Sequence, residues 1–483
     1  MSLVSVRLSA FAFVLAMPAL AAAEAPKLLT KVVPSTHKAS EVLTNQTLYV
    51  NPCVGGCMVT PGIDNATTST SSIAQKAANM QAGAWMTGEW QQILQCVQEV
   101  YSPYALTVTD QPPTGEYNMI IVGGSEADLG LNAPGAGGIA IVSPDCTPHT
   151  NSIAFAFVDT IDAFAAEDDN NRVWGMCWVI AQESAHLYGL DHEYEFTSTM
   201  RSACNDPMTY RSDCGGQKFY RNQSASCGEF GPARPGCGPT NTCSSTQNSH
   251  QKLLDTLGAG TSTIPAPTVS ITLPAAGAVA KGFAVQAAAG SQRGVDHVDL
   301  YLNGFKWQTA VGAPFGLAGQ QNPSNYALVE PNNVPDGVID IVVKAYDDLG
   351  IETDSATVTV TQGSPCASAA SCLTGQKCDA GKCYWDPAMG QIGATCTYDQ
   401  FCVSGMCQGT SSEKICTQNC VVGSTGTCPM GLDCVDTGGS SGICFPPASG
   451  GGCCSASNTR GPWVHLGLGA LVLALVMRRR RRR

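Results

Sequence analysis

Residues 182–192, QESAHLYGLDH, constrain the fold more than any other stretch of the sequence. On an α-helix, Gln182 and His186 lie one turn apart on the same face, so both can reach one metal ion. Glu183 lies beside them and would face a water molecule on that metal. Gly189 permits a left-handed turn at the helix end, which would bring His192 back as a third ligand. The spacing therefore predicts a helix that ends at a metal site.

A second segment, NDPMTY at residues 205–210, follows at a suitable distance. Together the two segments resemble the metzincin zinc metallopeptidases, whose signature is His-Glu-x-x-His-x-x-Gly-x-x-His followed by a methionine turn. The later signature positions match, and Gln182 stands where the first histidine is expected. Met208 would be the methionine of the turn. The Met-x-Tyr order that includes Tyr210 is similar to the astacin and serralysin branches.

The resemblance implies a cofactor, zinc, and a role for each matched residue. The implied metal ligands are Gln182, His186 and His192. The implied catalytic residues are Glu183, as general base, and Tyr210, as oxyanion partner. Gly189 and Met208 would be structural.

Gln182 leaves the activity open. Its side chain is neutral and about as long as the reach of the distal imidazole nitrogen, so a bound zinc would keep its charge and still activate water. An amide oxygen, however, is a weaker donor to zinc than imidazole. The first hypothesis is a secreted, cell-surface zinc endopeptidase that hydrolyses extracellular protein or peptide. The second is a non-catalytic metzincin-like protein for surface binding or adhesion. A chance motif in an unrelated fold would require Gly189, Met208 and Tyr210 all to be coincidental.

The cysteines place the chain in an oxidising compartment. The 24 cysteines form even groups: ten at 53–243, twelve at 366–444, and the pair Cys453–Cys454. Even grouping predicts disulfides that close within domains. The formal net charge of −12 argues against a nucleic-acid partner. At 483 residues the chain is long enough for several domains.

Residues 1–23 have the pattern of a secretory signal: Arg7, an apolar run at 8–20, and an Ala-x-Ala cleavage site at 21–23. A membrane anchor is the alternative, but the run is short for a membrane span.

Residues 24–260 are expected to form the metzincin-like domain. We expect a first helix over 76–101, strands at 105–109, 117–122, 138–142 and 152–158, a metal-site helix over 168–188, and a last helix ending at 257. A capping box at 244–247 would open the last helix. By the resemblance, strand 152–158 is the candidate edge strand that aligns extended substrate; an ordinary buried strand is the alternative.

Several cysteine pairings stay open in this domain. Cys204 and Cys214 flank the methionine turn and could be bridged across it, but pairing with the cysteines at 227, 237 or 243 is equally allowed. Cys53 or Cys57 could hold zinc as a thiolate in a pro-segment, although disulfide pairing is the preferred interpretation.

Two further regions follow. Residues 261–363 contain short strands at 269–273, 283–288, 295–302, 338–346 and 356–361, which predict a β-sandwich similar to bacterial Ig-like domains. Residues 364–449 have few large apolar side chains, so their order must come from disulfides. Similar cysteine spacings at 366–383 and 396–416 predict a repeated module, either a spacer or a receptor-binding knot.

The C-terminal residues 450–483 contain Cys453–Cys454, an apolar segment at 463–477 and six arginines at 478–483. The arginines would fix the orientation of a transmembrane segment. The combination resembles the MYXO-CTERM sorting signal, which implies a sorting protease that cuts near Cys453–Cys454 and a mature protein at the cell surface or outer membrane. A permanent membrane anchor is the alternative. The predicted fold class is thus multidomain: an α+β metzincin-like domain, an Ig-like β-sandwich, a disulfide-rich segment and a C-terminal transmembrane sorting helix.

Overall fold

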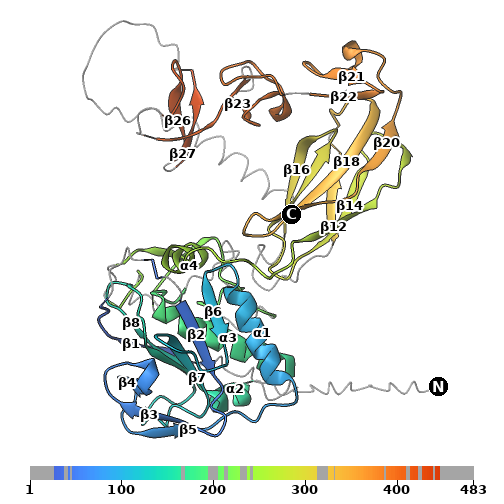
Figure 1. The fold of residues 1–483 in the computed structure, drawn as a ribbon. Coiled ribbons are helices and arrows are strands. Elements are labelled where there is room, and N and C mark those ends of the chain that lie inside the picture. The colour runs from blue at the N-terminus through green and yellow to red at the C-terminus, as the bar shows by residue number, and fades with distance from the viewer. Residues whose placement is uncertain are drawn as a thin grey trace, which may run out of the picture. The chain divides into compact units, whose positions relative to one another are not determined.

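The computed structural model describes residues 27–36, 42–43, 46–164, 169–193, 205–210, 216–228, 236–239, 243–312, 325–330, 332–385, 388–409, 414–422, 427–438 and 441–446. The chain divides into two compact units, residues 1–386 and 387–483. The described part is multidomain and contains several β-sheets, a β-sandwich and a disulfide-rich segment (Figure 1). The expected signal at 1–23 and sorting signal at 450–483, with its transmembrane segment 463–477, lie outside the described residues.

A mixed six-stranded sheet forms the centre of the N-terminal domain, in the order β1-β8-β9-β7-β2-β6. Its strands are β1 (Lys27–Val32), β2 (Gln46–Asn51), β6 (Leu106–Thr109), β7 (Asn118–Val122), β8 (Ala136–Val142) and β9 (Ile153–Ala156). The strands β6, β2, β7 and β9 run parallel, β8 is antiparallel to β9, and β1 is parallel to β8. All residues of β7, β8 and β9 are buried, as expected for strands covered on both faces.

The strands expected at 105–109, 117–122, 138–142 and 152–158 are therefore confirmed, but the choice of edge strand is wrong. Strand β9 lies between β8 and β7 in the sheet, so the region 152–158 is an ordinary buried strand. Its continuous apolar sequence favours a central position, because an edge strand usually carries polar residues.

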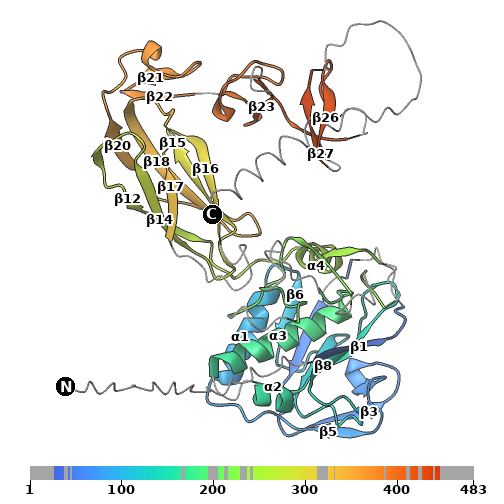
Figure 2. The same ribbon diagram turned by 180° about the vertical axis from the view of Figure 1, so that it is seen from behind.

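Two helices pack together on one face of this sheet: α1 (Glu89–Tyr101) and α3 (Asp169–Leu187) (Figure 2). The disulfide Cys96–Cys177 joins them. The helix expected over 168–188 is confirmed as α3. The expected helix 76–101 begins too early, because residues 78–80 form β5 and Gly88 has a left-handed backbone (φ 82°) that starts the helix only at Glu89. A short helix, α2 (Val158–Phe164), precedes α3.

Smaller elements complete the domain. A second sheet has the order β4-β3-β5, with β3 (Cys57–Pro61), β4 (Thr70–Ser71) and β5 (Ala78–Met80). Strands β10 (Ser224–Ser226) and β11 (Thr246–Asn248) pair antiparallel, and α4 (Ser249–Leu257) follows. The expected capping box at 244–247 is wrong: the Asn248 side chain accepts from the Gln251 amide at 2.9 Å and caps α4.

Residues 268–362 form a β-sandwich. One sheet has the order β12-β14-β17, and the other β13-β20-β18-β15-β16, with β19 paired to β18. The strands are β12 (Thr268–Leu273), β13 (Gly277–Val279), β14 (Ala284–Gly290), β15 (His297–Leu302), β16 (Phe305–Val311), β17 (Asn325–Val329), β18 (Gly337–Tyr346), β19 (Glu352–Asp354) and β20 (Val358–Gln362). Side chains alternate between buried and partly exposed along β18, so the two inner faces make the core. The sequence missed β13, β16, β17 and β19.

The cysteine-rich region contains repeated pairs of crossed disulfides. The bonds are Cys366–Cys378 with Cys372–Cys383, Cys396–Cys407 with Cys402–Cys416, and Cys420–Cys434 with Cys428–Cys444. Each set joins the first cysteine to the third and the second to the fourth, so the expected repeat extends to 420–444. Residues up to Asp386 belong to the first compact unit, so the first repeat lies with the sandwich rather than with the later repeats.

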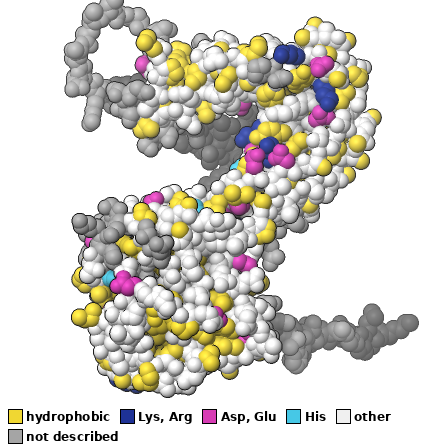
Figure 3. All heavy atoms as spheres, viewed as in Figure 1, with side chains coloured by type: hydrophobic (Ala, Val, Ile, Leu, Met, Phe, Trp, Pro, Cys, Tyr) yellow, Lys and Arg dark blue, Asp and Glu magenta, His cyan; other side chains and the backbone are white. Residues whose placement is uncertain are grey.

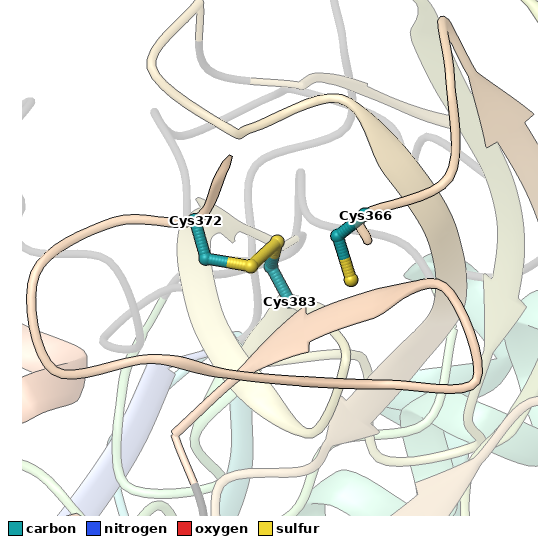
Figure 4. A group of neighbouring side chains, drawn as sticks. All are labelled: Cys366, Cys372 and Cys383. Carbon is teal, nitrogen blue, oxygen red and sulfur yellow. A yellow bond between two sulfur atoms is a disulfide. The ribbon is translucent and has the colours of Figure 1, made fainter. Parts of the chain in front are cut away.

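Figure 4 shows the sulfur atoms of Cys366, Cys372 and Cys383, three of the four cysteines of the first repeat, close together. Groups of three cysteine sulfurs lie within 4.8 Å of one another in each repeat. Each of these sulfurs is already in a disulfide, so none is a thiolate that could bind a metal.

The described residues contain ten disulfides, which identifies an extracellular or secreted protein. Cys53 pairs with Cys57, so the alternative that one of them holds zinc as a pro-segment thiolate is wrong. Cys227 pairs with Cys237 and Cys243 with Cys146, which excludes them as partners of Cys204 and Cys214, both outside the described residues. Within the described residues, no helix is long and apolar enough to cross a membrane. On the face seen in Figure 3, basic side chains are scattered and form no continuous surface.

Candidate functional site

Helix α3 carries the first part of the candidate site in its last two turns. Gln182, Glu183 and His186 are all fully buried there. The helix is apolar on most sides before them, with Met176, Val179 and Ile180 also fully buried. The helix thus passes through the core, and its polar residues are enclosed between the sheet and the segments that follow.

Glu183 is a buried carboxyl group against the glycine of a strand. A Cβ atom added to Gly138 of β8 would lie 2.5 Å from Glu183 Cγ and 2.6 Å from its Oε1, so only glycine leaves room for this side chain. Both carboxyl oxygens lack a hydrogen-bond partner among the described residues. Burial raises the pKa of Glu183 well above its usual value. A buried carboxyl group without a partner is costly for folding, which points to a functional role.

The end of α3 is a glycine turn that orients His186. Gly189 has φ +85°, and the Leu190 amide donates to the Ala185 carbonyl at 3.2 Å, which closes the helix end. A Cβ at Gly189 would lie 2.4 Å from the Cys146 carbonyl oxygen, so the position requires glycine for space as well. The turn brings the Leu190 carbonyl to 2.8 Å from His186 Nδ1. Because a carbonyl only accepts, Nδ1 is the donor and a neutral His186 keeps the lone pair on Nε2.

His192 returns to the helix as the sequence predicts. Its Nε2 lies 2.9 Å from His186 Nε2, with the ring centroids 4.5 Å apart. Asp191 fixes the turn, because its carboxylate accepts from the His192 amide at 2.8 Å and from the Gly238 amide at 2.6 Å. The Gln247 side chain bonds both the amide and the carbonyl of Asp191, at 2.8 and 2.9 Å. His192 is fully buried as a result.

The segment 205–210, which contains Met208, is hydrogen-bonded to the end of the His192 segment. The Asp206 carboxylate accepts from the Met208 amide at 2.8 Å and, with its other oxygen, from the Arg221 amide at 2.8 Å. The Met208 carbonyl accepts from the Glu193 amide at 2.9 Å. Trp178 of α3 donates its indole N–H to the Pro207 carbonyl at 2.8 Å. These bonds tie the turn to both the helix and the His192 segment, and Met208 is fully buried.

Tyr210, two residues after Met208, brings its hydroxyl group to His192. Its hydroxyl oxygen lies 2.5 Å from His192 Nδ1 and 3.4 Å from His192 Nε2. It also lies 3.4 Å from the carbonyl oxygen of Leu28 in β1. The structure thus brings His186, His192 and Tyr210 together, while Glu183 lies on the same helix against β8.

Burial also sets the protonation of the surrounding groups. It lowers the pKa of His186 well below its usual value, and the nearby His192 lowers it further, so His186 is neutral at physiological pH. Glu193 and Asp206 form a buried carboxyl pair behind the site. Burial raises the pKa of Asp206 to about 6 and that of Glu193 well above its usual value, with Asp206 adding to the latter.

The donor types suit a zinc ion. His186 and His192 offer neutral imidazole nitrogens, which zinc prefers. The amide oxygen and nitrogen of Gln182 have no hydrogen-bond partner among the described residues, one turn before His186 on α3. An unpartnered buried amide one helical turn before His186 fits a ligand role for its oxygen.

Sequence reasoning missed several residues that shape this site. Gly138, Asp191, Asp206 and Glu193 position the predicted residues, and Leu28 reaches Tyr210. The role of Gly138 could have been found from the sequence, because consecutive glycines at 137 and 138 within a strand indicate that a side chain or backbone approaches the strand closely. The roles of Asp191 and Asp206 depend on backbone turns that no spacing reveals.

Comparisons with known proteins give no family. No family model and no curated protein matches the chain. One matching solved structure is that of fibronectin(III)-like modules of CbhA from Clostridium thermocellum, at 20% identity over 20% of this chain and 99% of that one, with a TM-score of 0.15. Another is an LPMO from Kitasatospora papulosa, at 13% identity over 27% of this chain and 66% of that one, with a TM-score of 0.13. At these TM-scores neither supports a conclusion about this chain.

Proposed function

We propose that the protein is a secreted zinc-dependent endopeptidase that hydrolyses peptide bonds in extracellular proteins or peptides. One observation carries the proposal. A buried glutamate without a hydrogen-bond partner, Glu183, is seated against Gly138 on the helix that also presents His186 to His192. A general base for hydrolysis must be close to the attacking water and free to accept a proton, and Glu183 is free in this sense.

The metal would be held by His186 and His192 through Nε2 and by the Gln182 amide oxygen. Zinc bound there would supply Lewis-acid polarisation of the substrate carbonyl and of the attacking water. The Leu190 carbonyl keeps the Nδ1 proton of His186 and so directs the Nε2 lone pair inward. The Tyr210 hydroxyl, 2.5 Å from the His192 ring, would donate to an oxyanion that develops beside the histidines in place of the Leu28 carbonyl, to which it donates at 3.4 Å.

Glu183 would accept the proton from water and return it to the leaving amine. Burial raises the pKa of its carboxyl group, so the carboxylate is a stronger base than an exposed glutamate. A cation at the adjacent ligands would favour the charged form and lower this pKa again. The two effects on the pKa of Glu183 therefore oppose each other.

Metal content tests the proposal most directly. We expect the purified mature protein to retain about one zinc per chain, and Gln182→His to hold the same stoichiometry more tightly, since imidazole is the better donor. Glu183→Gln is the matched catalytic variant, because it keeps the size of the side chain and removes the base. It is expected to bind zinc like the parent and to lose peptide hydrolysis by at least about a hundredfold. A folded parent that retains no zinc at micromolar metal would refute the proposal.

A second function has one observation in its favour. Gln182, Glu183, His186 and His192 are all fully buried, and a site that never opens would serve a non-catalytic protein of surface binding or adhesion. In that case neither the parent nor Gln182→His would cleave peptides, whatever their zinc content. Peptide cleavage that disappears in Glu183→Gln excludes this alternative.

We further propose that the protein is displayed at the cell surface or outer membrane. The disulfides already identify an exported chain, and the segment at 450–483 resembles a sorting signal. A sorting protease would cut near Cys453–Cys454 after the apolar segment has entered the membrane. Removing residues 478–483 should shift the protein from the surface fraction to the medium, and an intact C-terminus on mature surface protein would instead indicate a permanent anchor.

A further inference from the structure

A buried charged cluster joins the N-terminal domain to the β-sandwich, which belong to one compact unit. The cluster consists of three side chains: Arg221, which precedes β10, Arg293, between β14 and β15, and Asp348, between β18 and β19. These side chains are 3%, 1% and 4% exposed, respectively. Buried charges are costly for folding unless each is paired and hydrogen-bonded, so their partners decide what this contact does.

The partners in this cluster are reciprocal. Arg293 donates from Nε and Nη2 to the two carboxylate oxygens of Asp348, each at 2.8 Å, and Arg221 Nη1 lies 3.5 Å from the same carboxylate. Arg293 also donates to the Tyr220 carbonyl at 2.9 Å, while Arg221 donates to the Arg293 carbonyl at 2.6 Å. Burial alone would raise the pKa of Asp348, but the two guanidinium groups lower it below its usual value, so the carboxylate is charged at neutral pH. Each domain thus supplies a backbone acceptor to the arginine of the other.

The Phe219 ring packs near both arginines. Phe219 is fully buried, and its ring centroid lies 5.0 Å from Arg293 Cζ and 5.8 Å from Arg221 Cζ. A guanidinium group near a buried ring gains a cation–π attraction that is larger than at an exposed site. Removing the Asp348 carboxylate would take away the group that pairs with both arginines, and breaking a buried ion pair in this way is strongly destabilising. The contact therefore depends on every member of the charged cluster.

The residues that meet the sandwich also hold the segment that contains Met208. The Phe219 amide donates to the Asn205 carbonyl at 3.0 Å. The Arg221 amide donates to one carboxylate oxygen of Asp206 at 2.8 Å, and the Met208 amide donates to the other oxygen at 2.8 Å. The backbone of residues in contact with the sandwich thus fixes the turn at Met208.

Tyr220 extends the same connection to helix α3. Its side chain is fully buried, and its hydroxyl donates to the Ala181 carbonyl at 2.8 Å, one residue before Gln182. Its own carbonyl is the acceptor of Arg293. A single residue therefore links the sandwich to the helix that carries the candidate site.

We propose that Arg293 and Asp348 of the β-sandwich are positioning residues of the candidate site, which they support through residues 219–221. The sandwich is then part of the functional unit and not a spacer. Its support of the segment that contains Met208 does not depend on zinc. The consequence that the charged cluster strengthens zinc binding at His192 rests on the proposed endopeptidase function.

Hydrogen exchange in the full mature chain, without added metal, tests the support of the site. Mass spectrometry follows two peptides, which cover residues 205–210 and 216–222. Asp348→Asn keeps the size of the side chain and removes the charge that pairs with both arginines. Asp340→Asn is the matched control, because it is the same substitution in the same sandwich, at a carboxylate that pairs with Lys382 near the start of β18. We expect exchange in both peptides to be at least about tenfold faster in Asp348→Asn than in the parent or Asp340→Asn.

A milder variant and the parent itself cover the case in which Asp348→Asn does not fold. Arg293→Lys keeps the positive charge but loses the planar fork that bonds a carboxylate and a backbone carbonyl together, so it should speed exchange in the same peptides by a smaller factor. In the parent, peptides that cover residues 216–222 and 291–296 should open together, with the same dependence of exchange on denaturant. Unchanged exchange at 205–210 in the folded variants would overturn the proposal, as would independent opening of the two parent peptides.

Metal binding distinguishes a positioning role from a purely structural one. Zinc affinity is measured by competition with a chromogenic chelator, and we expect it to fall at least about tenfold in folded Asp348→Asn and to stay unchanged in Asp340→Asn. Cobalt(II) in place of zinc gives a d–d absorption spectrum that reports ligand geometry, and this spectrum should change only in Asp348→Asn. Equal zinc affinity and an unchanged spectrum in Asp348→Asn would overturn the positioning role. If the parent binds no zinc, the endopeptidase proposal fails, and the exchange measurement still decides whether the sandwich supports the segment that contains Met208.

Discussion

The contact between Gly138 and Glu183 gives the sharpest test of the candidate site. We expect Gly138→Ala to be destabilising, because the added methyl group would lie 2.5 Å from Glu183 Cγ inside a closed core. Forcing one extra carbon into a packed core typically costs about 1–3 kcal/mol in the free energy of unfolding. Gly138 does not have a positive φ, so the cost would come from the contact and not from the backbone.

Gly175→Ala is the matched control. Gly175 lies in α3, and a Cβ there would make an ordinary contact of 3.6 Å with Ile161 Cγ2. Replacing a helical glycine with alanine where space allows stabilises a protein by about 0.4–1 kcal/mol. The two glycine substitutions should therefore have opposite signs.

A double-mutant cycle with Glu183→Ala identifies the collision partner. This substitution removes Cγ and the carboxyl group, so Gly138→Ala should lose most of its penalty in that background, with a coupling energy of at least about 1 kcal/mol. Gly175→Ala should show no coupling to Glu183→Ala. The stability of each variant is measured by calorimetric unfolding of the full chain. The transition that moves on Glu183→Ala substitution identifies the N-terminal domain, and its midpoint is compared between variants. The reasoning is refuted if Gly138→Ala is neutral, or if its penalty is unchanged when Glu183 is absent.

Three further predictions concern stability. In the zinc-free protein, burial raises the pKa of Glu183 in the folded state above its usual value of 4.5, so the folded state binds the carboxyl proton more tightly than the unfolded state does. The free energy of unfolding should therefore fall as the pH rises from the unfolded pKa of Glu183 to its raised folded pKa. Glu183→Gln should remove this fall in thermal unfolding of chelator-treated protein, and an unchanged pH profile would contradict the prediction. Replacing both Cys96 and Cys177 by alanine opens a bridge across 81 residues and should cost on the order of 4 kcal/mol in denaturant unfolding, with no loss expected if the bond does not form. Asn248→Ala should cost about 1 kcal/mol by removing the cap of α4, whereas Asn248→Asp should retain most of the stability in the same assay.

The sequence predicted elements where local pattern decides structure. The α3 helix and the strands β14, β15 and β18 follow from apolar periodicity, and the Gly189 turn follows from its position after the helix. The sheet order could not be predicted, because periodicity reports which face of a strand is buried and not which strand lies beside it. For that reason β9 was mistaken for the edge, and β1 was missed altogether. The cysteine groups were predictable, but their crossed pairing within each repeat was not, since spacing does not fix connectivity.

The candidate site was predictable as a set of residues and not as an arrangement. Spacing placed Gln182 and His186 on one helix face, and the structure brings His192 to His186 as expected. The groups that hold these residues are mostly backbone atoms and buried carboxylates, such as the Leu190 carbonyl and Asp206. Such partners are set by tertiary turns, which a pattern of side chains in one sequence does not encode.

This dependence on backbone partners bears on the role of Gln182. His186 is oriented by the Leu190 carbonyl, and the His192 segment is held by Asp191, Gln247 and the Met208 carbonyl. None of these hydrogen bonds involves Gln182, whose amide has no described partner. In the proposed zinc site, glutamine in place of histidine at this position would therefore leave the geometry of the two imidazoles intact and weaken only one ligand. Gln182 would weaken the binding of zinc without dismantling the site that receives it.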